Sequence, residues 1–219
     1  MRTKRSAYIS LSLACCYIIG FVCLFTFFSP LIDGKLDKKE QIAYYMSNKV
    51  SLQFWYLTIY VLFGVLLIPL VSMVKNLFKK NSLSDFASIV GYIWAAFVMA
   101  SGFIFTVGIE KISQMKVDIE SIHVIFTTIQ IIQDALSGGV ELLGGIWVFC
   151  IGVIALKSKY WNKYFNLFSL LLGSIVFITV LPYFYGFVGV FGMLQIIWFI
   201  WLGFMLCREQ EYVSTYILW

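Results

Sequence analysis

The sequence is poor in charged residues. Only 12% of its 219 residues are Asp, Glu, Lys or Arg, about half the roughly 25% of an ordinary soluble domain. The hydrophobic fraction is 61%, and the mean hydropathy is +0.91. The apolar residues are gathered in blocks of about 20, the length at which a helix crosses a hydrocarbon core of about 30 Å. The composition therefore predicts an all-α, polytopic transmembrane helical bundle.

Histidines and reactive cysteine patterns are also scarce. His123 is the single histidine, which excludes a haem held by two histidines of this chain. Neither an HExxH zinc motif nor a GxSxG nucleophile motif occurs. The five cysteines lie in or beside apolar segments without a CxxC pair, so we interpret them as small core residues: Cys15, Cys16, Cys23, Cys150 and Cys207. We expect no metal site, no cofactor and no catalytic triad.

Six apolar segments predict six membrane spans. They are Ala7–Phe28, Gln53–Val74, Phe86–Ile109, Gly138–Leu156, Tyr164–Tyr185 and Phe187–Leu206. Basic residues gather on the cytoplasmic loops of membrane proteins. With the N-terminus inside, the inner segments carry a net charge of +7 and the outer segments −2, which together give the chain's +5. We therefore predict one transmembrane domain over residues 1–219 with both termini cytoplasmic.

This topology also explains the basic balance of the chain. Lysines and arginines on the inner side contact anionic lipid headgroups, so membrane lipids are the expected partners. The charge gives no reason to expect binding of nucleic acid.

Residues 118–156 would form a helix of about 58 Å at 1.5 Å per residue, too long for one crossing. The first half is amphipathic. Its apolar face is Ile122, Ile125, Phe126, Ile129, Ile132 and Leu136, and its polar stripe is Glu120, His123, Thr127, Gln130, Asp134 and Ser137. We predict an amphipathic helix over about 119–136 that lies along the outer membrane interface. The glycines of SGG at 137–139 would then form a corner that leads into span four.

Glu141 follows this corner and has two interpretations. In the first turn of span four, the helix dipole would favour its carboxylate, which would then cap or pack. Alternatively, Gly138, Gly145 and Gly152 are spaced by seven and lie on one helix face that Glu141 roughly shares. Small residues let helices approach closely, so Glu141 would point into the bundle. An ionisable group placed there is a candidate for binding a ligand, a proton or an ion.

Rare polar groups converge on the same membrane end in this topology. Gln195 lies near the middle of the last span, where a helix–helix hydrogen bond is the simpler interpretation. We hypothesise an outward-facing cavity lined by Glu141, Gln195, Tyr183, Asp134, His123 and Gln130. The cavity would bind a small or lipid-like molecule, or a partner protein, without catalysis. Transport, with Glu141 as a protonatable switch, is the mechanistic extension.

Two other functions stay open from the residues alone. A membrane-embedded enzyme acting on lipid or isoprenoid substrates would need clustered acids, histidines or a metal. Its candidates are Glu120, His123 and Asp134. A structural or regulatory subunit is suggested by the glycine face and the short loops, and it would pack against a second copy of the chain or another membrane protein.

Two stretches resemble a known but uncharacterised family of small bacterial membrane proteins with six spans. They read GGVELLGGIWVFCIGVIALKSKYWNKYFNLFSLLLGSIVFI at 138–178 and IIWFIWLGFMLCRE at 196–209. In that family an acid and glycines precede a tryptophan-bearing span, and a short basic loop and a WLG-like final span follow. The resemblance implies six helices in a bacterial inner membrane. It implies no substrate and no catalytic residue.

Overall fold

The computed structural model describes residues 2–78, 82–179 and 188–216, without the side chains of residues 2, 3, 137–140, 179, 188 and 209–216. Every regular element in these ranges is helical. The elements are α1 (Arg2–Thr26), η1 (Ser29–Leu31), α2 (Lys38–Ser47), α3 (Lys49–Tyr56), the π-helical η2 (Leu57–Leu62), α4 (Phe63–Leu77), α5 (Ser82–Ser113), α6 (Ile119–Lys157), α7 (Lys163–Thr179) and α8 (Val188–Tyr216). The predicted all-α class is confirmed.

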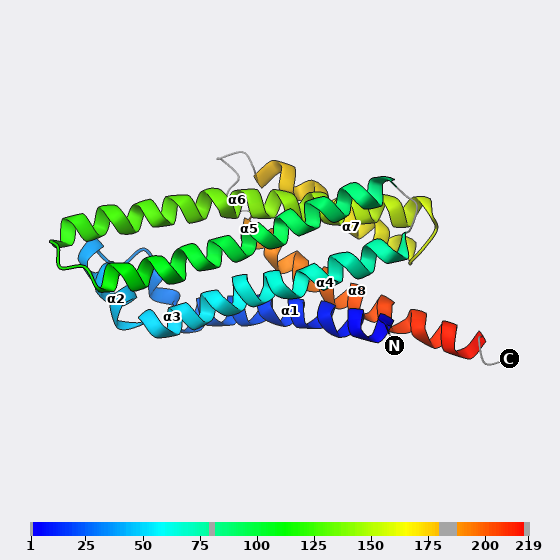
Figure 1. The fold of residues 1–219 in the computed structure, drawn as a ribbon, viewed down its shortest axis with the longest axis horizontal. Helices are drawn as coiled ribbons and strands as arrows, with labels where there is room; N and C mark the ends of the chain where they lie inside the picture. Colours follow the sequence, from blue (N-terminus) through cyan, green and yellow to red (C-terminus); the bar gives the residue numbers. More distant parts are fainter. Residues whose placement is uncertain (1, 79–81, 180–187, 217–219) are drawn as a thin grey trace.

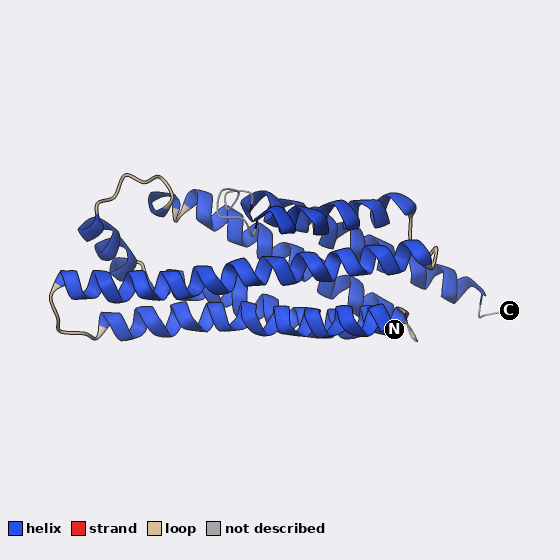
Figure 2. Cartoon of the chain, turned by 90° about the horizontal axis from the view of Figure 1, so that it is seen from above, coloured by secondary structure: helices blue, strands red, loops and turns tan. Residues whose placement is uncertain are grey.

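The long helices pack in the order of the chain. α1 packs against α4, α4 against α5, α5 against α6 and α6 against α7; α8 contacts both α7 and α1 and so closes a ring. Successive long helices run in opposite directions, and α1 begins where α8 ends (Figure 1, Figure 2). We call this the terminal end of the bundle. The opposite end, where α5 ends and α6 begins, is the distal end.

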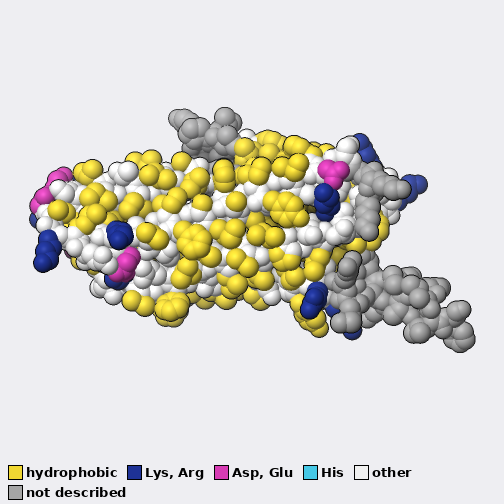
Figure 3. All heavy atoms as spheres, in the orientation of Figure 1, with side chains coloured by type: hydrophobic (Ala, Val, Ile, Leu, Met, Phe, Trp, Pro, Cys, Tyr) yellow, Lys and Arg dark blue, Asp and Glu magenta, His cyan; other side chains and the backbone are white. Residues whose placement is uncertain are grey.

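Within the described ranges, five helical segments are long and apolar enough to cross a membrane: Lys4–Thr26, Lys49–Leu77, Ser82–Ser113, Ile119–Lys157 and Gly189–Arg208. Figure 3 shows hydrophobic side chains over the middle of the visible face and charged side chains toward its two ends. Helix α7 is apolar but shorter. It ends at Thr179, and residues 180–185 of the predicted fifth span lie outside the described ranges.

The predicted corner at 137–139 is wrong, because α6 continues through these residues as one helix of 39 residues (Figure 1). Helix α5 has 32 residues and lies along α6. Its Gly108 contacts Ile129, and its Trp94 contacts Gly144, so α5 supports α6 on both sides of the glycines. Glycine permits a turn but does not impose one. The segment 119–136 is therefore the first half of a long packed helix and not a separate interfacial helix.

Helix α6 begins with a side-chain cap. Oδ2 of Asp118 accepts a hydrogen bond from the Ser121 amide at 3.0 Å, and Oδ1 accepts one from the Ser121 hydroxyl at 2.8 Å. These bonds stabilise the ionised carboxylate, so they lower the pKa of Asp118. The cap lies 23 residues before Glu141 in the chain, and Glu141 is therefore not a first-turn residue.

The distal end has a hydrophobic core of its own, distinct from the main core between the long helices. This distal core consists of Phe28, Tyr45, Leu52, Phe105, Ile109, Ile112 and Phe126. The rings of Tyr45 and Phe126 pack with centroids 4.4 Å apart. Phe126 of α6 therefore belongs to this core, and Ile122, Ile125 and Ile129 of the same face pack against it, whereas Ile132 is exposed.

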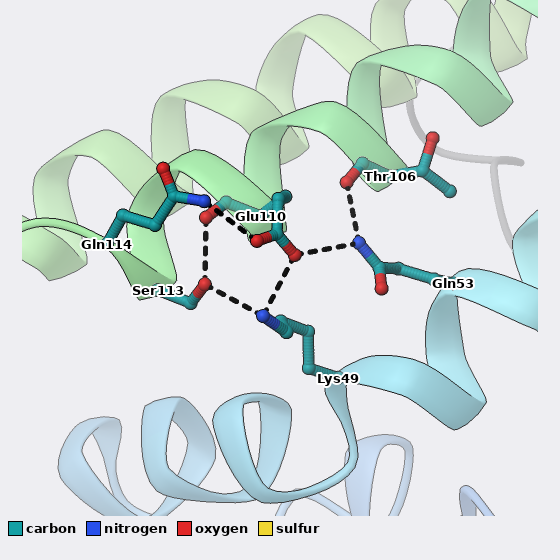
Figure 4. Close-up of polar contacts among 6 residues, drawn as sticks. All are labelled: Lys49, Gln53, Thr106, Glu110, Ser113 and Gln114. Carbon is teal, nitrogen blue, oxygen red and sulfur yellow. Dashed lines mark hydrogen bonds and ion pairs between the residues drawn. The ribbon is translucent and has the colours of Figure 1, made fainter.

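A polar network fastens the start of α3 to the end of α5 (Figure 4). Nζ of Lys49 lies 2.8 Å from Oε2 of Glu110 and donates to the Ser113 hydroxyl at 3.0 Å. Oε1 of Glu110 accepts from the Gln114 amide at 2.8 Å, and the Gln53 amide donates to the Thr106 carbonyl at 3.1 Å. A network holds its side chains in place better than an isolated surface pair does.

We expect Glu110→Gln to lower the thermal midpoint of the protein in detergent, because Lys49 would lose its counter-charge. Asp85→Asn is the matched control, since Asp85 forms an ion pair with Lys75, at 2.9 Å, and both of those side chains are more exposed. The control should have the smaller effect. Equal shifts in the two variants would show that the network adds nothing beyond a surface ion pair.

Helices α6 and α7 approach closely through glycine. A Cβ placed on Gly173 would lie 2.6 Å from the Gly145 carbonyl oxygen and 2.8 Å from Cα of Phe149. Both atoms belong to the α6 backbone, which cannot move aside without moving the helix. Gly152 makes a similar contact, since its Cβ would lie 3.1 Å from the Asn166 carbonyl oxygen. Small residues thus set the distance between the two helices.

We therefore expect Gly173→Ala to reduce stability by about 1–3 kcal/mol, the usual penalty for overpacking, although alanine favours helix more than glycine does. Gly189→Ala is the control, because a Cβ there meets nothing within 4 Å. Thermal unfolding in the same detergent would compare them. An undiminished midpoint for Gly173→Ala would mean that α6 and α7 are not in contact at this position.

Candidate functional site

Three tryptophans from three helices form a layer across the middle of the bundle. The rings of Trp94 (α5) and Trp147 (α6) have centroids 5.9 Å apart, and those of Trp147 and Trp198 (α8) are 5.4 Å apart. Each is at most 1% exposed. Trp198 donates its indole hydrogen to the Ser169 hydroxyl at 2.8 Å, whereas Nε1 of Trp94 has no partner among the described residues.

A cavity of about 280 Å³ lies on the distal side of this tryptophan layer. Helices α1, α3, η2, α4, α5, α6 and α8 all contribute to its lining. Aromatic rings dominate the wall: Tyr17, Phe21, Trp55, Tyr60, Phe63, Trp94 and Phe191. Trp147 and Trp198 lie farther along α6 and α8 toward the terminal end. The layer therefore separates the cavity from that end of the bundle.

Glu141 is the one charged side chain among the described lining residues. Its Oε2 is buried and has no hydrogen-bond partner among the described residues, and its carboxyl group lies within electrostatic range of the Tyr17 phenol. The inward orientation predicted from the glycine spacing is confirmed. The reason is that Gly144 and Gly145, one turn farther on, hold α6 against Trp94 of α5 and Val176 of α7.

The depth of Glu141 differs from the sequence prediction. It shares the cavity with Val98 of α5. Along α5, Val98 is about 20 Å from Asp85 and about 18 Å from Glu110, at 1.5 Å per residue. Glu141 therefore lies near the middle of the apolar stretch between these acids and not at its distal edge. The interpretation as a capping residue is excluded, since α6 is capped by Asp118.

The π-helical segment η2 forms one side of the cavity through Ile59 and Tyr60. Glycines on both neighbouring helices make room for it. A Cβ on Gly20 of α1 would lie 3.2 Å from Ile59, and a Cβ on Gly102 of α5 would lie 2.8 Å from Cβ of Tyr60. Short π-helical segments inside α-helices are often found at functional sites.

The other predicted site residues that the structure describes are not part of the cavity lining. Gln195 is fully buried on α8, and neither its amide nitrogen nor its oxygen has a partner among the described residues, so the predicted helix–helix hydrogen bond is absent. Asp134 is exposed on α6. Nδ1 of His123 lies 3.5 Å from the Thr127 hydroxyl oxygen. Tyr183 lies outside the described residues.

Gln130 contacts the distal core through Tyr45 and is not part of the described cavity lining. Its amide donates to the Tyr45 hydroxyl at 3.4 Å. Burial raises the pKa of Tyr45 to about 12, so this phenol stays protonated at neutral pH. Because α6 is one continuous helix, Gln130 and His123 lie nearer the distal end than Glu141 does.

Two further features do not compete with the cavity. An open hollow of about 390 Å³ lies at the surface between α3 and α5, but its acid, Glu110, is already paired with Lys49. In the described parts of the chain, no three His, Cys, Asp or Glu residues are grouped so that they could hold a metal ion. Glu141 and its aromatic surroundings are therefore the candidate site.

Sequence patterns did not assign the aromatic lining. Trp55, Trp94, Tyr17 and Tyr60 give no sequence signal apart from their place in apolar segments. They come from four separate elements, so only the assembled bundle shows that they face one another.

The chain was compared with protein-family models, with curated proteins and with solved structures, and none of the three comparisons found a match. The resemblance to a family of bacterial six-span proteins therefore stays a prediction.

Proposed function

We propose that this chain is an integral membrane protein that binds a small, largely apolar ligand in the cavity around Glu141. The observation that carries this proposal is the buried, unpartnered Oε2 of Glu141 in an aromatic cavity near mid-depth. A buried polar atom without a partner destabilises a fold. Ionisable groups inside membrane bundles mark ligand or ion sites by default.

The size and lining of the cavity suit a small ligand. Its volume of about 280 Å³ is close to the lower limit of the usual range for ligand sites, about 300–1,000 Å³. Such sites combine a mostly apolar wall with a few polar groups that orient the ligand. Here the wall is aromatic, and Glu141 supplies the charged group.

In this proposal the protein has six spans, with α7 and the residues after it as the fifth, in the bacterial inner membrane. Both termini are cytoplasmic. The terminal end, with its net charge of +7, then faces the cytoplasm, as the positive-inside rule predicts. The tryptophan layer would separate the cavity from the cytoplasm. The cavity would thus receive its ligand from the outer side or from the bilayer, and transport would require this layer to open.

We expect Gly189→Phe to weaken ligand binding, because Gly189 lines the cavity and a Cβ there meets none of the described residues within 4 Å. The probe is 1-bromo-4-neopentylbenzene, a neutral molecule whose bromine quenches nearby tryptophans such as Trp55 and Trp94. The affinity should fall at least about tenfold, which corresponds to 1.4 kcal/mol. Titration of tryptophan fluorescence in lipid nanodiscs measures it.

Val190→Phe is the matched control, since Val190 is the next residue and its side chain is 45% exposed on the surface of the bundle. It adds the same ring to the lipid-facing side and should leave the quenching curve unchanged. If both variants quench like the unmodified protein, the probe is only in the lipid and the cavity is not a binding site.

A further inference from the structure

We infer that the ligand of the cavity is a hydrophobic organic monocation and that Glu141 releases one proton when the cation binds. This inference rests on the proposed binding function and names its substrate class. It follows from three properties of the site: the sign of its charge, the chemistry of its wall and the buried carboxyl oxygen Oε2 of Glu141, which has no partner among the described residues.

The charge of the site has one sign. No lysine, arginine or histidine is among the described lining residues, and Glu141 is the acid. The other titratable groups that face it are Tyr17 and Cys16 from α1 and Tyr60 from η2; α3, α4, α5 and α8 contribute none to the described lining. None of these groups becomes positive. The cavity is therefore neutral or negative, which disfavours anions and favours cations.

The wall is suited to a cation that has lost its water. A positive group over the face of a tryptophan, tyrosine or phenylalanine is attracted by the ring, by about 2 kcal/mol or more when desolvated. Rings from α1, α4 and α5 form a contiguous part of this wall. Tyr17 and Phe63 meet edge to face with centroids 5.2 Å apart, and Phe63 and Trp94 are 5.6 Å apart. An ammonium group with methyl or aryl substituents can contact several rings at once.

A metal cation fits the site less well. Calcium takes six to eight oxygen ligands, and magnesium takes six in near-octahedral geometry. Glu141 is the one carboxylate in the described lining, and helix carbonyls are already used in backbone hydrogen bonds. A cation that needs aromatic faces and a single counter-charge is therefore the better match.

The carboxyl group of Glu141, whose Oε2 has no partner among the described residues, couples the cation to a proton. An ionised carboxylate in an apolar cavity is strongly disfavoured unless it is paired. Without a bound cation, Glu141 is therefore a neutral carboxylic acid. When the cation enters, the O–H bond of the acid breaks, the proton leaves to water, and the carboxylate pairs with the ligand. One positive charge replaces another, so the net charge of the site does not change.

The experiment compares two probes of the same shape. One is (4-bromobenzyl)trimethylammonium, and the other is its neutral isostere, 1-bromo-4-neopentylbenzene, in which carbon replaces the charged nitrogen. Both are titrated against the full chain in nanodiscs by tryptophan quenching. A pH indicator in weakly buffered solution counts the protons released per cation bound.

We expect the cavity-specific affinity for the cation to exceed that for the isostere at least about tenfold. About one proton should be released per cation, and cation affinity should fall about tenfold per pH unit in acidic solution, since the proton and the cation compete for one carboxylate. Glu141→Gln should remove the proton release and reduce the preference for the cation at least tenfold. The control is Asp134→Asn, because Asp134 is an exposed carboxylate on the same helix. This variant should change neither the proton release nor the preference for the cation.

The outcomes separate the two proposals. If Gly189→Phe affects neither probe, the cavity does not bind ligands and the proposed function fails. If Gly189→Phe weakens the neutral probe but the cation has no advantage, or if Glu141→Gln keeps the full preference, the cation inference alone is overturned. Thermal unfolding of each variant shows that it is folded before binding is measured.

Discussion

The close contact of α6 with α5 on one side and α7 on the other determines where the important groups of this bundle lie. Gly144 receives the ring of Trp94, and Gly173 of α7 lies against the backbone of α6 at Gly145. Side chains of any size at these positions would push the helices apart. Glu141, one turn earlier on α6, is directed into the bundle by contacts in which it takes no part. The position of the charge is thus a result of apolar packing.

The fold carries polar groups that it does not satisfy internally. The Trp198 indole donates a hydrogen bond to the Ser169 hydroxyl, which shows that the bundle can pair a buried donor. Glu141 and Gln195 have buried atoms without a partner among the described residues, and a buried polar atom without a partner opposes folding. The surrounding aromatic and aliphatic packing must offset this. Proteins concentrate such exceptions at functional sites, and the position of Glu141 in a cavity agrees with that rule.

The sequence predicts the parts of this structure that depend on local pattern. Apolar blocks predict the helices, and the spacing of Gly138, Gly145 and Gly152 predicts the inward side of α6. The depth of Glu141 depends instead on whether the helix turns at residues 137–139. The glycines there are compatible with both a corner and a straight helix. The straight helix forms because α5 is long enough to pack against α6 on both sides of the glycines, and a local sequence pattern does not show this contact. The convergence predicted for His123, Gln130 and Glu141 depended on that corner and is absent without it.

The π-helical segment η2 keeps two parts of one helix in phase with two different cores. Before it, Trp55 and Tyr56 pack against the distal core; after it, Phe63 belongs to the main core. A π-helical turn holds about one residue more than an α-helical turn, and each residue of an α-helix turns the chain by about 100°. Deleting one residue between 57 and 62 would restore α geometry and rotate one half against the other by about that angle. The segment therefore tolerates substitutions better than changes in length, because the number of its residues, more than their identity, aligns the cavity wall with the distal core.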